Sequence, residues 1–141
     1  MELIETAAIG DGALLLIDTA PIVYILERHP RFAIRFESLF ERHARGEVSF
    51  AVTTIGIAEV LSGPIAGRDE ILTRRYRTLL ETWQVVDLTT DIAESAARLR
   101  AAYRLRLPDA IQAASAIGIG ASALVTHERD FSKLSGLRVL G

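Results

Sequence analysis

Short apolar runs alternate with longer segments of helical periodicity along this chain. Residues 13–17 (ALLLI) are a continuous apolar run, typical of a strand covered on both faces of a sheet, and the mostly apolar segments 48–52 (VSFAV) and 123–126 (ALVT) predict two more strands. The segments at 83–88 (WQVVDL) and 137–140 (LRVL) predict two further strands. The pattern therefore predicts five strands, most of them separated by helices.

Apolar positions spaced three and four residues apart predict the intervening helices. Threonine or aspartate at a cap and proline in a first turn favour the helix starts. We expect Gly63 and Pro64 to end the helix that follows the second strand. The predicted helices begin at Pro21, cover residues 31–45, follow Thr53 and Thr54, cover 68–81 and 91–103, and run from Pro108 towards Gly118 and Gly120.

Strands that alternate with helices indicate an α/β fold, here a three-layer α/β/α sandwich with a mostly parallel central sheet. A chain of 141 residues is long enough to bury a sizeable core, so we expect one domain over 1–141, with 1–12 as a lead-in segment. No apolar run is long enough to cross a membrane and no signal-peptide pattern opens the chain, so we expect a cytoplasmic protein.

Composition narrows the possible chemistry. The chain has no cysteine, which excludes disulfides and thiolate chemistry and leaves oxygen or histidine ligands for any metal. The net charge of −2 argues against a basic protein that coats nucleic acid. Lys133 is the only lysine, so arginine carries the remaining positive charge of the side chains. Arginine suits phosphates and carboxylates, but genome composition or surface ion pairs explain this bias more simply.

Acidic residues stand near strand ends, where functional groups gather in open α/β sheets. Asp18 directly follows the first strand, and Asp109 opens the helix before the fourth strand. Glu128 and Asp130 follow that fourth strand, while Glu59 interrupts the apolar segment IGIAEVL after the second strand. Simpler roles exist for single members of this set: Asp18 would serve as a helix N-cap, and Glu59 would point outward from a half-exposed helix.

As a set, the acids predict a metal site. Carboxylates gathered in one cleft repel one another and raise one another's pKa, so a fold tolerates them mainly around a cation. Hard carboxylate oxygens without cysteine or histidine select Mg²⁺ or Mn²⁺. Such an ion lowers the pKa of a bound water and braces the oxygens of a phosphodiester during in-line attack. The expected chemistry is hydrolysis of a phosphodiester, without a serine or histidine nucleophile.

Four segments, taken in order, resemble the PIN-domain family, in particular the VapC-like toxins of toxin–antitoxin pairs. They are LLLIDTAPIVYILERHPRF, TTIGIAEVLSGP, LRLPDAIQAASA and ALVTHERDF, and the resemblance covers residues 13–140. It implies a three-layer α/β/α fold and Mg²⁺- or Mn²⁺-dependent ribonuclease activity. It also implies a homodimer, an RNA substrate and neutralisation by an antitoxin encoded alongside.

The resemblance also assigns residues. Asp18, Glu59 and Asp109 match the acidic triad of the family. The family usually has Asp, or sometimes Asn, two residues after the threonine that ends the strand, where this chain has Glu128. We expect Glu128 to be the fourth acid, with Asp130 as the alternative. Two hydroxyl residues would orient a ligand or water, or else serve only as backbone caps: Thr126 and Thr19.

Two other functions remain open at the level of the sequence. A phosphate-accepting receiver domain would need an acidic neighbour beside Asp18 and a suitably placed late lysine, and this chain has neither. The stronger alternative is a PIN-like module that binds RNA or a protein without cutting. The intact set of acids argues against that alternative, and a metal-dependence assay on mixed RNA would distinguish the two.

Overall fold

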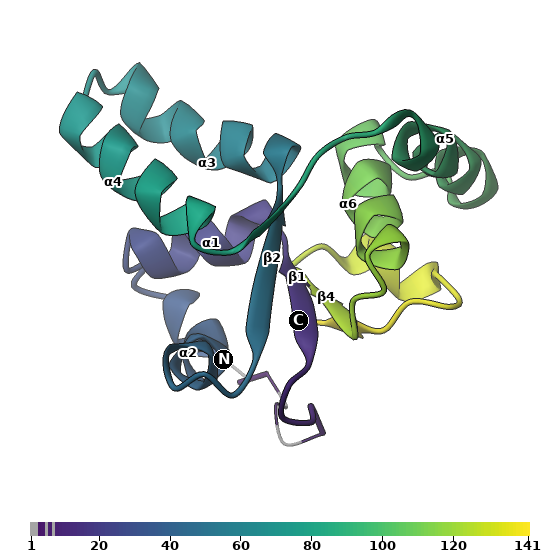
Figure 1. The fold of residues 1–141 in the computed structure, drawn as a ribbon, viewed down its shortest axis with the longest axis horizontal. Coiled ribbons are helices and arrows are strands. Elements are labelled where there is room, and N and C mark those ends of the chain that lie inside the picture. Colours follow the sequence, from purple (N-terminus) through teal and green to yellow (C-terminus); the bar gives the residue numbers. More distant parts are fainter. Residues whose placement is uncertain (1–2, 5, 7) are drawn as a thin grey trace.

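Five parallel strands form one sheet in the part of the chain that the computed structural model describes, residues 3, 4, 6 and 8–141 (Figure 1). Their order in the sheet is β3-β2-β1-β4-β5, and each of the four pairings is parallel. The first and last residues of each strand lie within two residues of the bounds predicted from the sequence. The bounds are β1 (Leu14–Ile17), β2 (Ser49–Thr53), β3 (Gln84–Val86), β4 (Ala123–Val125) and β5 (Val139–Leu140).

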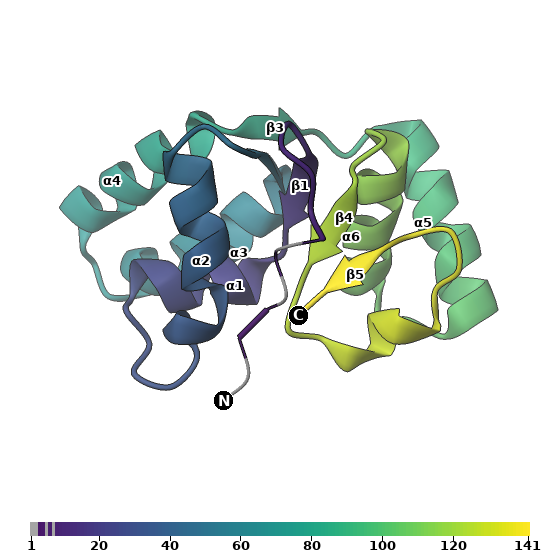
Figure 2. The same ribbon diagram turned by 90° about the horizontal axis from the view of Figure 1, so that it is seen from below.

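Helices cover both faces of this sheet, as Figures 1 and 2 show. One layer comprises α1 (Thr19–Leu26), α2 (Ala33–Ala44), α3 (Thr54–Ala66) and α4 (Glu70–Glu81). The other comprises α5 (Thr90–Tyr103) and α6 (Leu107–Gly118). A short 3₁₀ helix that the sequence pattern did not predict, η1 (Arg129–Lys133), follows β4. The predicted three-layer α/β/α architecture is confirmed.

Side chains of the central strand alternate between two apolar cores, because successive residues of a strand point to opposite faces. Leu15 and Ile17 of β1 are buried with Phe36 of α2 in the first core. Leu16 is buried in the second core, against a row of small residues on α6. Small side chains let α6 lie close to the sheet, as the small-residue pattern predicted. Those residues are Ala110, Ala113, Ala114 and Ala116.

The prediction that Gly63 and Pro64 end a helix is wrong. Helix α3 continues to Ala66, and Pro64 is buried inside it. Proline breaks a helix chiefly by removing one hydrogen bond and crowding the preceding turn. Here it stands in the last turn, and the amide of Gly67 still donates to the carbonyl of Gly63 at 3.0 Å. The helix therefore loses little at Pro64, and α3 and α4 together form a long arm.

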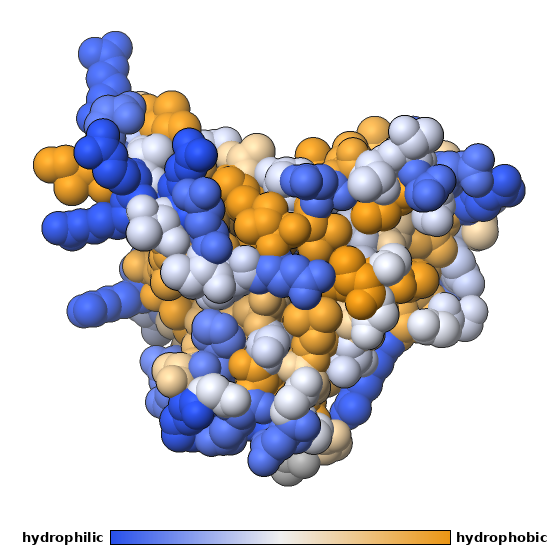
Figure 3. Space-filling view, in the orientation of Figure 1, coloured by the Kyte–Doolittle hydropathy of each residue, from blue (hydrophilic) through white to orange (hydrophobic). Residues whose placement is uncertain are grey.

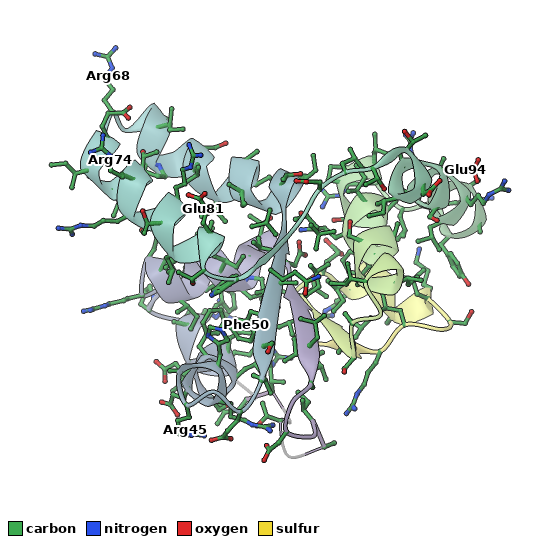
Figure 4. All side chains as sticks on the ribbon, in the orientation of Figure 1. Arg45, Phe50, Arg68, Arg74, Glu81 and Glu94 are labelled. Carbon is green, nitrogen blue, oxygen red and sulfur yellow. The ribbon has the colours of Figure 1, made fainter. Side chains whose placement is uncertain are left out.

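This arm and α5 project from the sheet on either side of a hollow (Figures 1 and 3). Figure 3 shows that apolar side chains are prominent on the floor of the hollow. Figure 4 shows Arg68 and Arg74 pointing outward from the arm, away from the sheet. The hollow therefore lies between the arm and the α5–α6 layer.

The lead-in segment packs against α2 where it is described. The amide of Ile4 donates to the carbonyl of Arg35 at 3.2 Å, and Arg42 donates to the carbonyls of Thr6 and Ile9 at 2.9 Å each. The predicted lead-in segment also includes residues 1, 2, 5 and 7, which lie outside the described residues. Among the helices in the described part of the chain, none is both long and apolar enough to cross a membrane.

The strand order creates a topological switch point between β1 and β4. From β1 the chain builds outward through β2 and β3, then returns to the other side of β1 for β4 and β5. In open α/β sheets, ligands bind in the crevice beyond the carboxyl ends of such strands. Ile17 pairs with Val125 at this edge. The next residues along the two strands are Asp18 and Thr126, which the fold therefore brings together.

Candidate active site

Asp18 is buried at the carboxyl end of β1, where its carboxylate accepts three hydrogen bonds. Oδ1 accepts from the amide of Thr19 at 2.8 Å and from Nε2 of Gln112 at 2.9 Å. Oδ2 accepts from the hydroxyl of Thr126 at 2.7 Å. The first bond is the N-cap of α1, so the simpler role for Asp18 is real. The other two come from α6 and from the end of β4, and they fix the direction of the carboxylate.

Gln112 joins three elements beneath the site. Its side chain is buried on α6, donates to Asp18, and accepts a hydrogen bond from the hydroxyl of Thr53 at 2.7 Å. That hydroxyl also caps α3 by accepting from the amide of Gly56 at 2.8 Å. The sequence prediction missed Gln112. A signal was available, because it is the one large polar side chain in a helix of small residues, three positions after Asp109.

Asp109 is also buried, in the first turn of α6. Burial raises the pKa of this carboxyl group above its ordinary value. The hydrogen bond from Nε of Arg106, at 3.0 Å, lowers that pKa without offsetting the burial, and the charges of Asp18 and Glu128 raise it further. The carboxylates are therefore close enough to repel, as expected for acids gathered in one cleft.

The side chain of Glu59 points outward from α3. Its side chain is exposed, and Oε1 accepts a hydrogen bond from the hydroxyl of Thr19 at 3.0 Å. Glu59 therefore requires no buried partner. Thr19 contributes its amide to Asp18 and its hydroxyl to Glu59, so one residue links two of the predicted acids.

Glu128 and Asp130 occupy different positions at the end of β4. Glu128 lines the same cavity as the other three acids, and its amide donates to the hydroxyl of Thr126 at 2.9 Å. Its Oε1 accepts from the amide of Asp130 at 3.2 Å, which starts η1. Asp130 itself is exposed and is not one of the residues that line the cavity.

The four predicted acids surround a cavity of about 380 Å³. Among the described residues, no three Asp, Glu or His side chains already converge on one point as metal ligands. Two contacts hold them apart: Thr19 engages Glu59, and Arg106 lies between Asp109 and Glu128. Hard carboxylate oxygens on one cavity fit Mg²⁺ or Mn²⁺ in their chemistry, but the side chains must turn to bind such an ion. The other residues that line the cavity are Thr19, Ala20, Val23, Tyr24, Arg106, Pro108 and Gln112.

Arg106 supplies the cation of this acidic cluster. Its Nε bonds Asp109, and its Nη2 lies 3.8 Å from Oε2 of Glu128. The side chain is 72% exposed, so it is held mainly by these contacts at the rim of the cavity. The sequence prediction missed this residue as well, although a basic residue three positions before Asp109 in a helix start is the spacing at which the two side chains meet.

A parallel sheet with an acid-lined cavity at its switch point defines a class of α/β proteins with a carboxylate site beyond the strand ends. Within that class, the chain belongs to the PIN-domain family, whose model matches residues 15–137. The resemblance inferred from the four sequence segments is confirmed. A search of curated proteins gave no significant match.

Solved structures of toxin–antitoxin proteins are similar to this chain. One is a chain of a toxin–antitoxin complex from Klebsiella pneumoniae, at 31% identity over 87% of this chain and 94% of that chain, with a TM-score of 0.70. A chain of VapBC-1 from nontypeable Haemophilus influenzae shares the fold at 18% identity, 89% and 96% coverage and a TM-score of 0.71. VapC20 from Mycobacterium tuberculosis shares it at 14% identity, 90% and 99% coverage and a TM-score of 0.69.

Proposed function

We propose that this protein is a metal-dependent endoribonuclease, the toxin of a toxin–antitoxin pair. The observation that carries the proposal is the meeting of four carboxylates on one cavity at the switch point of the sheet. The similarity to a chain of the Klebsiella pneumoniae toxin–antitoxin complex supports the toxin role. VapC20, which has the same fold, is described as a toxin that cleaves the sarcin-ricin loop, and this is a precedent for RNA cleavage by the fold.

Asp18, Asp109, Glu59 and Glu128 would hold Mg²⁺ or Mn²⁺, with Asp130 as the alternative to Glu128. An ion bound there would supply an acidified water and neutralise charge on the phosphodiester during in-line attack. Asp18 is held in one direction by three donors, so it would define where the ion lies. Thr126 orients Asp18 and also accepts the amide of Glu128, and it would thereby keep two ligands in register.

The remaining side chains of the site would act on the substrate and the approach to it. Glu59 stands on α3, across the cavity from Asp109 on α6, so the two carboxylates approach an ion from different elements. Arg106 is exposed at the rim, and its guanidinium group would move from the acids to a phosphate oxygen when a cation occupies the cavity. The hydroxyl of Thr19 would either release the carboxylate of Glu59, which then binds the ion, or keep its hydrogen bond to Glu59, which would then act as a base.

The proposed partners are a cognate antitoxin and a second copy of this chain. The complexes to which the chain is similar contain a toxin with its antitoxin. Arg106 already shows that a guanidinium group fits among the acids, so an antitoxin could block the site with a basic side chain. A homodimer is the expected assembly, and the cytosol is the expected compartment, where an RNA substrate and a co-encoded antitoxin are made.

The decisive experiment measures RNA cleavage by the purified protein with Mn²⁺, with Mg²⁺ and with excess EDTA. Cleavage of a mixed-sequence RNA is expected with either ion and not with chelator. Asp18→Asn should abolish it, whereas Asp130→Asn should leave most of it if Glu128 is the fourth acid. Robust cleavage in excess EDTA would falsify the metal mechanism, and RNA binding without cleavage in any condition would favour a silent PIN-like module.

A further inference from the structure

A second cavity, of about 700 Å³, lies next to the acidic one and shares Glu128 as a wall. Three arginines and two aromatic rings dominate it, and the segment after α1, helix α2 and the segment after β4 supply them. We call it the arginine pocket. Its lining residues are Arg31, Phe32, Arg35, His127, Glu128, Arg129 and Gly141.

Packed rings make the floor of the arginine pocket. The ring of His127 lies 4.8 Å from that of Phe32 at an angle of 63°, and its Nδ1 is 3.0 Å from the hydroxyl of Tyr24. Phe36 packs against the other rings from the core, with its centroid 6.1 Å from that of His127. The guanidinium carbon of Arg31 lies 5.3 Å from the centroid of Phe32, within the range of a cation–π contact. The floor is therefore built from rings that pack against one another.

The charge of this pocket comes from its arginines. Burial lowers the pKa of His127, and the nearby charges of Arg35 and Arg129 lower it further. Three arginines, Arg31, Arg35 and Arg129, line the pocket together. Glu128 is the one carboxylate side chain of the lining, and it faces the acidic cavity as well.

We propose that the arginine pocket binds a backbone phosphate of the RNA strand, next to the phosphate that would be cut at the acids. This inference rests on the proposed nuclease function. A strand whose scissile phosphate lies among the acids must continue over the adjoining surface, and the pocket adjoins them across Glu128. Guanidinium groups bind phosphate oxygens in a fork, and a ring floor suits ribose and bases better than it suits an acidic peptide. Phosphate contacts position a strand without reading its sequence.

The test compares the RNA affinity of a double variant of the pocket with that of a control variant, both without metal. The first is Arg31→Gln with Arg129→Gln, because both side chains are exposed. The control is Arg138→Gln, an exposed arginine that lines a separate cavity with Gly12 and Ser122, beyond the amino ends of the strands. A labelled single-stranded RNA of mixed sequence is titrated in EDTA by fluorescence anisotropy at several salt concentrations. Melting temperature and circular dichroism confirm that each variant is folded.

The double variant should bind this RNA about tenfold more weakly for each arginine removed. The slope of log affinity against log salt should fall by about 0.7 for each phosphate of the single strand that the variant no longer neutralises. The weakening should be similar for RNAs of different sequence, and Arg138→Gln should change the affinity and the slope much less. These results together would support the phosphate site.

Other results would overturn it and leave the nuclease proposal to its own assay. If the double variant binds RNA like the wild type, the pocket holds no phosphate, whether or not the wild type cuts RNA with Mn²⁺. If the double variant keeps its RNA affinity but no longer binds a polyglutamate peptide, the pocket accepts protein carboxylates instead. If the wild type binds RNA through the pocket but never cuts it, the phosphate site stands and the nuclease proposal fails.

Discussion

Arg106 and a metal ion would compete for the same carboxylate oxygens. The guanidinium group contacts both Asp109 and Glu128 in the protein without metal, so an ion that binds these acids must displace it. Because Arg106 is largely exposed, the ion pair is screened by water and contributes little. Its effect on the affinity of the site for a cation is therefore modest but measurable.

We predict that Arg106→Gln tightens Mn²⁺ binding about two- to fivefold, since the guanidinium group no longer competes with the ion for the carboxylates of Asp109 and Glu128. Isothermal titration calorimetry on the wild type and the variant measures this directly. Arg98→Gln is the matched control, because Arg98 forms a similar exposed ion pair with Glu94 on α5, at 3.5 Å. Equal affinities in Arg106→Gln and the wild type would show that Arg106 does not hold the metal ligands.

Asp109→Asn should abolish RNA cleavage and leave the metal-free fold as stable or more stable at neutral pH. The substitution removes a buried charge that repels Asp18 and Glu128, worth roughly 1 kcal/mol at near-surface dielectric. Two losses oppose this gain: the favourable charge at a helix start, about 0.3–1 kcal/mol, and the exposed ion pair with Arg106. Mn²⁺ should raise the melting temperature of the wild type much more than that of the variant, because it binds only the folded state.

The pH dependence of this stability difference follows from the raised pKa of Asp109. A carboxyl group whose pKa is higher in the folded state favours folding when protonated and opposes it when ionised. Any advantage of Asp109→Asn should therefore be present at neutral pH and shrink as the pH falls through the pKa of Asp109. Thermal unfolding in EDTA at about pH 7 and about pH 4 measures it. An advantage that grows in acid, or equal Mn²⁺ shifts in both proteins, would make Asp109 only a favourable charge in the first turn of α6.

At the residue scale, the sequence predicted the acids better than their supporting residues. Asp18, Asp109 and Glu128 follow strand ends or open a helix, and a parallel sheet brings such positions to one edge whatever the details of packing. The roles of Gln112 and Arg106 depend on which face of α6 meets β1 and on the rotation of that helix. Such tertiary details are not fixed by the local pattern, so both residues were missed.

At the element scale, α6 acts as a clamp between β1 and β2 through one buried amide. Gln112 donates to Asp18 after β1 and accepts from Thr53 at the end of β2. Gln112→Leu should lower the free energy of unfolding by about 1–3 kcal/mol, because the buried hydroxyl of Thr53 loses its acceptor and the buried carboxylate of Asp18 loses one of its three donors. Urea unfolding of metal-free protein measures this, and Gln84→Leu on exposed β3 is the control, expected within about 0.5 kcal/mol of the wild type.

The same variant should also weaken Mn²⁺ binding, since Asp18 loses one of the three donors that fix its direction. A stable Gln112→Leu protein with unchanged Mn²⁺ affinity would mean that the clamp serves the fold and not the site. This result is separable from misfolding, because the unfolding transition and the calorimetric titration are measured on one preparation.

Element boundaries were predictable where burial determines them. The central strands β1, β2 and β4 lie within two residues of their predicted ends because each is a mostly apolar run that the fold buries. The end of α3 was mispredicted because a local rule for proline was applied to a residue that the fold buries in the last turn. The short helix η1 was missed because it follows from the Glu128 cap and the burial of Phe131, and not from any apolar periodicity.

At the scale of the whole molecule, the arm and α6 leave large apolar side chains exposed. Several of them are at least 40% exposed and lie on α3, α4, α6 and the segment between β3 and α5. Large apolar side chains exposed in this number on a small protein favour a protein contact. The residues concerned are Ile65, Ile71, Leu79, Leu88, Leu107 and Ile117.

We therefore expect the isolated chain to form a homodimer at protein concentrations of about tens of micromolar, measured by light scattering after size exclusion. Association through apolar side chains is not screened by salt, so the dimer should persist at about 0.5 M NaCl, where the Debye length is well below 10 Å. A strictly monomeric species at this concentration would contradict the prediction. Dissociation caused by salt alone would instead show that charged surfaces hold the copies together, with the outward arginines of the arm, Arg68 and Arg74, as the first residues to substitute.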